Sequence, residues 1–506
     1  MVRNGGSDER RILLFVLLFV FVFVAVGWLG CSSEPPAPAV PEAPRHLVLI
    51  SVDTLGAKHV GAYGYARDTS RAIDALAARG VLFENTYTQQ VWTLTAHLSL
   101  MTGLHPQAHG ASEQRAAWPA APTLAATLKG AGFETAAFTG VGGYMSPRFG
   151  LGRGFDRYAI GKTHDARDDG RRIEWLRAQA KRSAADPGHR FFLFAHYFDV
   201  HSDVGTEVPY VAPEADARRY LDEVLPPGDS WQRSGDTDLL IELEKSGDAT
   251  DRDRAVLEAL YDAGVRYTDR EGVGRLLDAL DELGLAESTL VVLTSDHGEE
   301  ILEHGKVSHQ QPFDETARVP LVFAGPGLPR GERRGDLVEL VDVMPTVLSV
   351  LDVGVPEGIQ GRDLSPALRG GALAERPAHV DGLFGGLPTL KWRYPSAITM
   401  RVDGVRYSYV GTVHNEPTEQ GGRRFLMFRE GALYDLEADP GQTRDLAAER
   451  PYIAAQLRRA LLAWYEENER VARRLERESL EAGQDAGVPA PSEEEAARLR
   501  ALGYVE

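Results

Sequence analysis

A short apolar segment that ends in an acid and a histidine constrains this chain more than any other feature. Residues 289–295 are apolar and β-branched, which is typical of a strand buried on both faces. Asp296, His297 and Gly298 follow directly. Open α/β sheets bind ligands at the carboxyl ends of their central strands, so these side chains indicate a functional site, with Gly298 allowing a sharp turn. Taken alone, the three residues are also explained by a capping acid and an incidental histidine.

Two other stretches place similar groups at the ends of elements. Residues 46–52 form a second apolar segment, and Asp53 follows it. Residues 93–102 have the apolar spacing of a helix that begins at Thr93 and is stopped by Gly103. The sequence therefore predicts that two acids, one imidazole and one hydroxyl lie at the ends of three elements.

In this combination the motifs resemble those of the sulfatase family of the alkaline phosphatase superfamily, from about His46 to Tyr504. The resemblance implies an α/β fold: a large sandwich with a central, mostly parallel sheet, followed by a small C-terminal subdomain with an antiparallel sheet. It also implies an enzyme that acts on phosphoric or sulfuric esters, either as a hydrolase or as a phosphotransferase.

The resemblance implies a metal centre. Asp53, Asp296 and His297 match the metal ligands of the family, and the hydroxyl of Thr93 is expected to join them. Oxygen ligands with one imidazole suit a divalent cation such as Mn, Zn, Mg or Ca, and we expect one ion. Thr54 stands where many members carry a second acid, which weakens the case for calcium.

Thr93 matches the position of the family nucleophile. True sulfatases carry Cys or Ser there, within Cys/Ser-x-Pro-x-Arg, and convert it to formylglycine; here Thr95 and His97 replace the Pro and the Arg. Threonine cannot become that aldehyde, and Thr93 is similar instead to the nucleophilic threonine of nucleotide phosphodiesterases and lipoteichoic-acid synthases. A hydroxyl beside a metal is a competent nucleophile. The alternative is that Thr93 only caps the helix.

Two histidines complete the expected catalytic set. His201 and His309 match family positions where His or Lys contacts the ester oxygens or the leaving group. A different interpretation is that they hold a second metal together with Asp199, but the spacing of Asp199 and His201 differs from that of two-zinc relatives.

Three further side chains near the motifs are candidates, namely His97, Lys306 and Arg318. Of these three, His97 is included among the expected catalytic residues, after Thr93, His201 and His309. A structural hydrogen bond is the alternative for His97, and a solvated surface charge is the alternative for Arg318.

The N-terminus is expected to be a targeting segment. Arg10 and Arg11 precede the apolar residues 12–29, and Cys31 follows, which describes a lipoprotein signal peptide over residues 1–30. The resemblance to a bacterial lipoprotein box predicts a lipid anchor on Cys31, the only cysteine, and a Pro-rich tether over residues 31–45. The protein would then be held at a membrane of the cell envelope, facing the periplasm or the exterior. An uncleaved membrane anchor is the alternative.

The 506 residues are too many for one ordinary core. We expect a catalytic domain over residues 46–386 and a C-terminal α+β subdomain over residues 387–480, because the pattern changes to a hairpin around Asp403 and Gly404 and then to a long amphipathic helix from Pro451. Residues 481–506 are a charged tail.

Charge narrows the possible partners. The formal net charge of −19 argues against nucleic acid. It also means that an anionic ester substrate needs local positive charge, for which a bound metal is the usual source. Three interpretations remain open: a threonine-dependent hydrolase, with phosphoester or phosphodiester chemistry favoured; a true sulfatase; and a lipid-anchored binding protein with an inactive site.

Overall fold

The computed structural model describes residues 43–489 apart from residues 113–114, 141–142, 162–169, 203–209, 211, 228, 230–242, 245, 383–392 and 418–423. The predicted signal peptide, Cys31 and most of the predicted tether lie outside the described residues. Within the described part of the chain, no helix combines the length and the apolar character needed to cross a bilayer.

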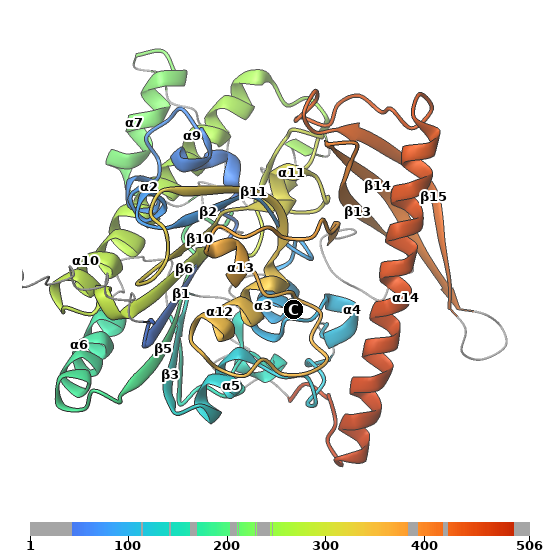
Figure 1. Ribbon diagram of the computed structural model, residues 1–506. Coiled ribbons are helices and arrows are strands. Elements are labelled where there is room, and N and C mark those ends of the chain that lie inside the picture. The colour runs from blue at the N-terminus through green and yellow to red at the C-terminus, as the bar shows by residue number, and fades with distance from the viewer. Residues whose placement is uncertain are drawn as a thin grey trace, which may run out of the picture. The chain divides into compact units, whose positions relative to one another are not determined.

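A nine-stranded sheet forms the centre of the large domain (Figure 1). Near the middle of the sheet, β1 (His46–Val52) lies between β6 (Thr289–Thr294) and β5 (Arg190–Tyr197). It is parallel to both. The order is β11-β2-β10-β6-β1-β5-β3-β4, with β9 beside β2; β10 is antiparallel to β2 and β6. The remaining strands are β2 (Val81–Tyr87), β3 (Phe133–Thr139), β4 (Arg157–Ile160), β9 (Arg318–Val319), β10 (Leu321–Ala324) and β11 (Glu332–Glu339).

Helices cover both faces of this sheet, which explains why its strands are apolar without alternation. In β1, Leu47 and Leu49 belong to the core on one face, and Val48 and Ile50 belong to the core on the other. The first face is covered by α3 (Thr93–Thr102), α5 (Leu124–Gly130) and α12 (Val343–Val350). The second is covered by α2 (Arg71–Ala78), α6 (Gly170–Ala185), α9 (Asp251–Thr268) and α10 (Arg275–Glu282). The predicted α/β fold with a mostly parallel sheet is confirmed.

One helical segment differs from its expected form. Regular helical periodicity predicts a single helix over residues 255–283, but α9 and α10 are joined by a π-helical segment, Asp269–Gly274. The carboxylate of Asp269 accepts hydrogen bonds from the N–H groups of Ala72 and Ile73 at the start of α2. The wider turn therefore lies where this helix anchors another element.

A separate four-stranded antiparallel sheet forms the small subdomain, in the order β12 (Ala378–Asp381), β13 (Arg393–Val402), β14 (Val405–Pro417) and β15 (Arg424–Asp435). Asp403 and Gly404 have φ of 51° and 85°, as a two-residue hairpin turn requires. The long helix α14 (Pro451–Glu481) packs its apolar stripe on this sheet. The shorter elements are α4 (Pro106–His109), α7 (Glu214–Val224), α11 (Asp314–Ala317), α13 (Ser365–Leu368), β7 (Glu300–Ile301) and β8 (Val307–Ser308).

Candidate active site

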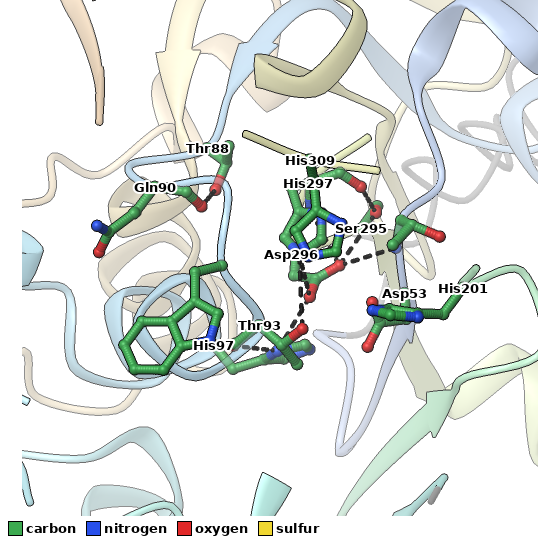
Figure 2. Close-up of polar contacts among 12 residues, drawn as sticks. Asp53, Thr88, Gln90, Thr93, His97, His201, Ser295, Asp296, His297 and His309 are labelled. Carbon is green, nitrogen blue, oxygen red and sulfur yellow. Dashed lines mark hydrogen bonds and ion pairs between the residues drawn. The ribbon is translucent and has the colours of Figure 1, made fainter. Parts of the chain in front are cut away.

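Three of the predicted ligands meet at the carboxyl ends of β1 and β6. The two strands are parallel neighbours, and Asp53 and Asp296 each follow the last paired residues. Asp53, Asp296 and His297 are fully buried, and one potential ligand atom from each lies within 4.8 Å of the others. Within the described residues this is the one group of three or more such side chains close enough to hold an ion. Figure 2 shows Asp296 and His297 beside Thr93, with Asp53 across from them.

Each carboxylate uses one oxygen as an anchor. Oδ1 of Asp296 accepts hydrogen bonds from the backbone N–H groups of Thr54 (3.1 Å) and His297 (2.9 Å). Oδ2 of Asp53 lies 3.0 Å from Nε2 of His196, which carries a proton because Nδ1 of the same ring accepts from Gly140 N. The other two oxygens, Oδ1 of Asp53 and Oδ2 of Asp296, are buried and have no hydrogen bond to any described residue. Buried carboxylate oxygens without donors fit a cation.

The protonation preferences of the cluster also fit a cation. Burial, reinforced by the charges of Asp296 and Glu299, raises the pKa of Asp53 well above its usual range. Burial opposes ionisation of Asp296 too, but the neighbouring histidines, His297 first, lower the pKa of Asp296 below its usual range. Burial lowers the pKa of His297 to about 3. Its Nδ1 donates to the carbonyl of Gly298 (3.1 Å), so the unprotonated Nε2 is the atom available to a metal.

Gly298 is required for a reason that differs from the expected one. Its φ is not positive, so it does not serve a left-handed turn. A Cβ atom at this position would lie 2.1 Å from the carbonyl oxygen of Glu315 and 3.0 Å from Cα of Gly56. The two loops after β1 and β6 therefore pack backbone against backbone, and Ser295 joins them by donating to the carbonyl of His297 and accepting from Leu55 N.

Thr93 is the first residue of α3, and its hydroxyl faces the cluster of Asp53, Asp296 and His297. Trp92 is the N-cap residue, and no side chain caps this helix, so the capping alternative does not describe Thr93. Oγ1 of Thr93 lies 3.5 Å from Nε2 of His297. The carbonyl of Thr93 accepts a hydrogen bond from Nδ1 of His97 (2.8 Å), and Nε2 of His97 accepts from the hydroxyl of Ser51 (2.9 Å). His97 thus ties the start of α3 to β1.

His309 and His201 lie next to the cluster. The ring of His309 lies 4.3 Å from that of His297 and 5.2 Å from that of His201, measured between centroids. Nδ1 of His309 lies 3.4 Å from Oε2 of buried Glu299, whose Oε1 accepts a hydrogen bond from Tyr210. Nδ1 of His201 donates to the carbonyl of Ser202 (2.6 Å). The Nδ1 atoms of His309 and His201 therefore each have a partner within the chain.

The other candidates occupy different surroundings. Asp199 is buried, but with His201 and His309 it forms no ligand group among the described residues. Lys306 forms an ion pair with Glu244. Arg318 donates to the carbonyl of Glu84 and lies over the ring of Tyr63. The structure connects neither cation with the carboxylate cluster.

Two residues of the site are absent from the sequence-based set, His196 and Glu299. His196 lies on β5, paired with Ser51 of β1, and is fully buried. A histidine within the apolar run of residues 190–197 is the signal that could have indicated it. Glu299 stands two residues after His297, and its proximity to that motif was the available signal.

Comparisons with known proteins place the chain in a family. The family model described as Sulfatase matches residues 45–353. Delta 4,5-hexuronate-2-O-sulfatase of Bacteroides thetaiotaomicron is 24% identical over 473 residues, covering 86% of this chain and 92% of that protein. Arylsulfatase K of Bos taurus is 27% identical over 217 residues, covering 42% of this chain and only 37% of that protein. The structure of a phosphonate monoester hydrolase from Silicibacter pomeroyi shares the fold, with a TM-score of 0.62 and 20% identity over 84% of this chain and 96% of that chain.

Proposed function

Because the chain belongs to the sulfatase family, we propose that it is a metal-dependent hydrolase of anionic esters in which Thr93 is the nucleophile. One observation carries the proposal: Oγ1 of Thr93 lies 3.5 Å from Nε2 of His297, in the same cluster as the two unpartnered oxygens of Asp53 and Asp296. A hydroxyl that only stabilised its helix would face the helix N–H groups instead.

The residues present fit one divalent cation. Asp53, Asp296 and His297 would hold it, with the hydroxyl of Thr93 beside them. When bound, such an ion supplies Lewis-acid chemistry that favours ionisation of a nearby hydroxyl and offsets negative charge on the ester. Manganese and zinc suit the imidazole ligand, and magnesium and calcium suit the carboxylates.

The roles of the chain follow from its hydrogen bonds. The hydroxyl of Thr93 gives up its proton to solvent, and its oxygen attacks the central atom of the ester, forming a Thr93–ester bond as the bond to the leaving alcohol breaks. His309, oriented by Glu299, is placed to donate the proton that the leaving oxygen takes up, and His201 is the second candidate for this role. Water then releases the group from Thr93. His97 acts as a positioning residue, because both of its nitrogens already have partners within the chain.

Phosphorus chemistry is favoured over sulfur chemistry by the nucleophile itself. The formylglycine of true sulfatases releases sulfate through breakdown of a geminal diol, and a threonine has no such exit. A group on a threonine oxygen must leave by displacement at the central atom, which phosphoryl groups undergo in line. Within the described part of the chain, Asp53 and Asp296 form ion pairs with histidines only and have no Lys or Arg side chain as a partner. This supports a monoanionic substrate such as a phosphodiester or a phosphonate monoester.

A sulfate ester is the second candidate substrate. It is favoured by the relative from Bacteroides thetaiotaomicron, a sulfatase by name, which is matched over 92% of its length. Sulfate monoesters carry the same single charge as phosphodiesters, so the charge of the site accepts both.

A screen of the purified protein separates these candidates. Phosphodiester, phosphomonoester and aryl sulfate substrates would be compared with Mn, Zn, Mg or Ca added, and the reaction would be quenched rapidly for mass spectrometry. We expect fastest turnover of a phosphodiester and a transferred group on the peptide that contains Thr93. Faster turnover of aryl sulfates would favour the second candidate, and no turnover of any ester would favour an inactive binding protein.

We also propose that the protein is a lipoprotein, attached through Cys31 to a membrane of the cell envelope and facing the periplasm or the exterior. The support is the sequence of residues 10–31, with its basic start, apolar run and single cysteine.

A further inference from the structure

One residue in the loop after β1 has a strained backbone. We call this loop, which contains Asp53, and the loop after β6, which contains Asp296 and His297, the metal-binding loops. Thr54 follows Asp53, is fully buried and has a φ of 54°, which places it in the left-handed region. A β-branched residue rarely adopts this conformation because its Cβ is crowded there. In this conformation its N–H donates to Oδ1 of Asp296. The strained residue is therefore the one that links the acid of β1 to the acid of β6.

One hydroxyl group from another element closes the turn around Thr54. The hydroxyl of Tyr261, on α9, donates to the carbonyl of Thr54 (2.6 Å) and accepts from the N–H of Gly56 (3.1 Å). Tyr261 is fully buried, and its ring is held between His59, at 4.6 Å, and Tyr210, at 5.4 Å. The chain thus has a rigid, specific partner for both backbone groups that flank Leu55.

We propose that Tyr261 is a positioning residue for the metal centre. Its hydroxyl holds Thr54 in the left-handed conformation, and the N–H of Thr54 in turn holds Asp296 so that Oδ2 stays free for the ion. Without that hydroxyl, the carbonyl of Thr54 and the N–H of Gly56 lose their buried partner. Thr54 then relaxes to an ordinary conformation, and its N–H leaves Asp296. The inference rests on the proposed metal site.

The test compares Tyr261→Phe with a matched control. Tyr63 is a half-buried tyrosine whose hydroxyl also bridges a carbonyl and an N–H, donating to Phe83 O (2.9 Å) and accepting from Leu321 N (2.8 Å). These two partners belong to β2 and β10 and not to the metal-binding loops. The affinity of the metal-free protein for Mn²⁺ would be measured by competition with a fluorescent chelator. We expect Tyr261→Phe to weaken Mn²⁺ binding by about 10–100-fold, the range found for partners of metal ligands, and Tyr63→Phe to leave it near the wild-type value.

A second pair of variants tests the link through strain. Glycine adopts the left-handed conformation without crowding, so Thr54→Gly should make the turn independent of the tyrosine hydroxyl. In the Thr54→Gly background, Tyr261→Phe should therefore cost little Mn²⁺ affinity. Equal losses in both backgrounds would overturn the proposal, as would equal losses in Tyr261→Phe and Tyr63→Phe.

The thermal midpoint of unfolding of each metal-free protein separates a loss of stability from a local change. An unchanged midpoint together with weaker Mn²⁺ binding indicates that the geometry of the site has changed. If Tyr261→Phe binds Mn²⁺ as tightly as the wild type, the positioning role is wrong while the proposed function stands. If the wild type binds no Mn²⁺, Zn²⁺, Mg²⁺ or Ca²⁺, the proposed function and this inference fail together.

Discussion

Asp53 and Asp296 stand at the ends of adjacent parallel strands, and each keeps one buried oxygen free of hydrogen bonds while the other is anchored. The anchors differ in kind: a histidine ring holds Asp53, whereas backbone N–H groups hold Asp296. The surroundings thus orient the two carboxylates without neutralising them. Among the described residues neither free oxygen has a hydrogen-bond donor, and the proposed ion would supply the missing partner.

Replacing Asp296 with Asn should remove the ion and the activity together. The substitution keeps the shape but deletes the charge and turns one oxygen into a donor, which a cation cannot use. Metal content per chain, measured by plasma mass spectrometry after dialysis, should fall to background. Asp381→Asn, at a buried acid outside the cluster, serves as the control and should keep its metal. Full metal content in Asp296→Asn would contradict the assignment.

Thr93→Ala should abolish turnover with little effect on folding. Its hydroxyl does not cap α3, so the variant should lose less than about 1 kcal/mol of unfolding free energy. If Thr93 forms the covalent bond, kcat should drop by at least about a thousandfold. Thr93→Ser should retain part of the activity.

Thr95→Ala is the control for Thr93. Thr95 stands two residues further along α3, and its hydroxyl donates to the carbonyl of Trp92. It should keep most of the activity. Near-normal turnover in Thr93→Ala, or a transferred group found on Thr95 or Ser99, would rule out the nucleophile.

Removing the partner of Asp53 should weaken metal binding without abolishing it. His196→Ala leaves Asp53 free to rotate, and the affinity for the ion should fall about 10–100-fold. His189→Ala, at a partly exposed histidine just before the start of β5, should leave the affinity unchanged. An unchanged affinity in His196→Ala would show that Asp53 is held by other means.

These variants also mark where the sequence was informative. Asp53, Asp296 and His297 come at the ends of apolar strands. A local sequence pattern therefore indicates both the strand and the candidate metal-binding side chains that follow it. Asp403 and Gly404 are a similarly local signal, because this pair is typical of a two-residue hairpin turn. The structure has the turn that they predict. Such features need only a few consecutive residues to be recognised.

Features that depend on distant partners were not visible. His196 reads as one polar residue in an apolar strand, and its role depends on Asp53, 143 residues away. Gly298 reads as a turn residue, whereas its actual constraint is the carbonyl of Glu315 on another segment. Tyr261 looks like an ordinary core aromatic until Thr54 lies beside it. Only the assembled sheet brings these partners together.

The stability of the fold should depend on the protonation of Glu300. Burial raises the pKa of this carboxyl to about 8, above its usual value of about 4.3. The folded protein therefore holds the proton more tightly than the unfolded chain. That contribution to stability is complete below about pH 4 and is lost as the pH rises through about 8.

Glu300→Gln should remove this loss, because an amide offers the same shape to the N–H groups of Gln310 and Gln311. Above about pH 8 the variant should exceed the wild type by on the order of 5 kcal/mol in free energy of unfolding, with a smaller difference at about pH 5. Urea unfolding at several pH values measures this, with exposed Glu282→Gln as the control. A difference that does not change with pH would contradict the expectation.

Cys31→Ser should block lipid attachment. The expectation comes from the sequence of the N-terminus, where Cys31 follows the apolar run. In cells fed a labelled fatty acid, the wild type should incorporate the label and the variant should not. Intact mass should show the wild type beginning at residue 31. Equal labelling of both proteins would refute the lipoprotein assignment.

The hydrogen bond from Thr54 to Asp296 joins residues that are 242 positions apart. While the chain is being made, Asp53 emerges early and has no companion until β6 has been synthesised and has docked beside β1. Contacts between such distant segments form late in folding, because a long loop must close first. An incomplete chain that stops before β6 has only one of the three acid and imidazole ligands, so it cannot retain an ion. Uptake of an ion at the proposed site would therefore be a late step in the making of the molecule, and it would report that the central strands have come together.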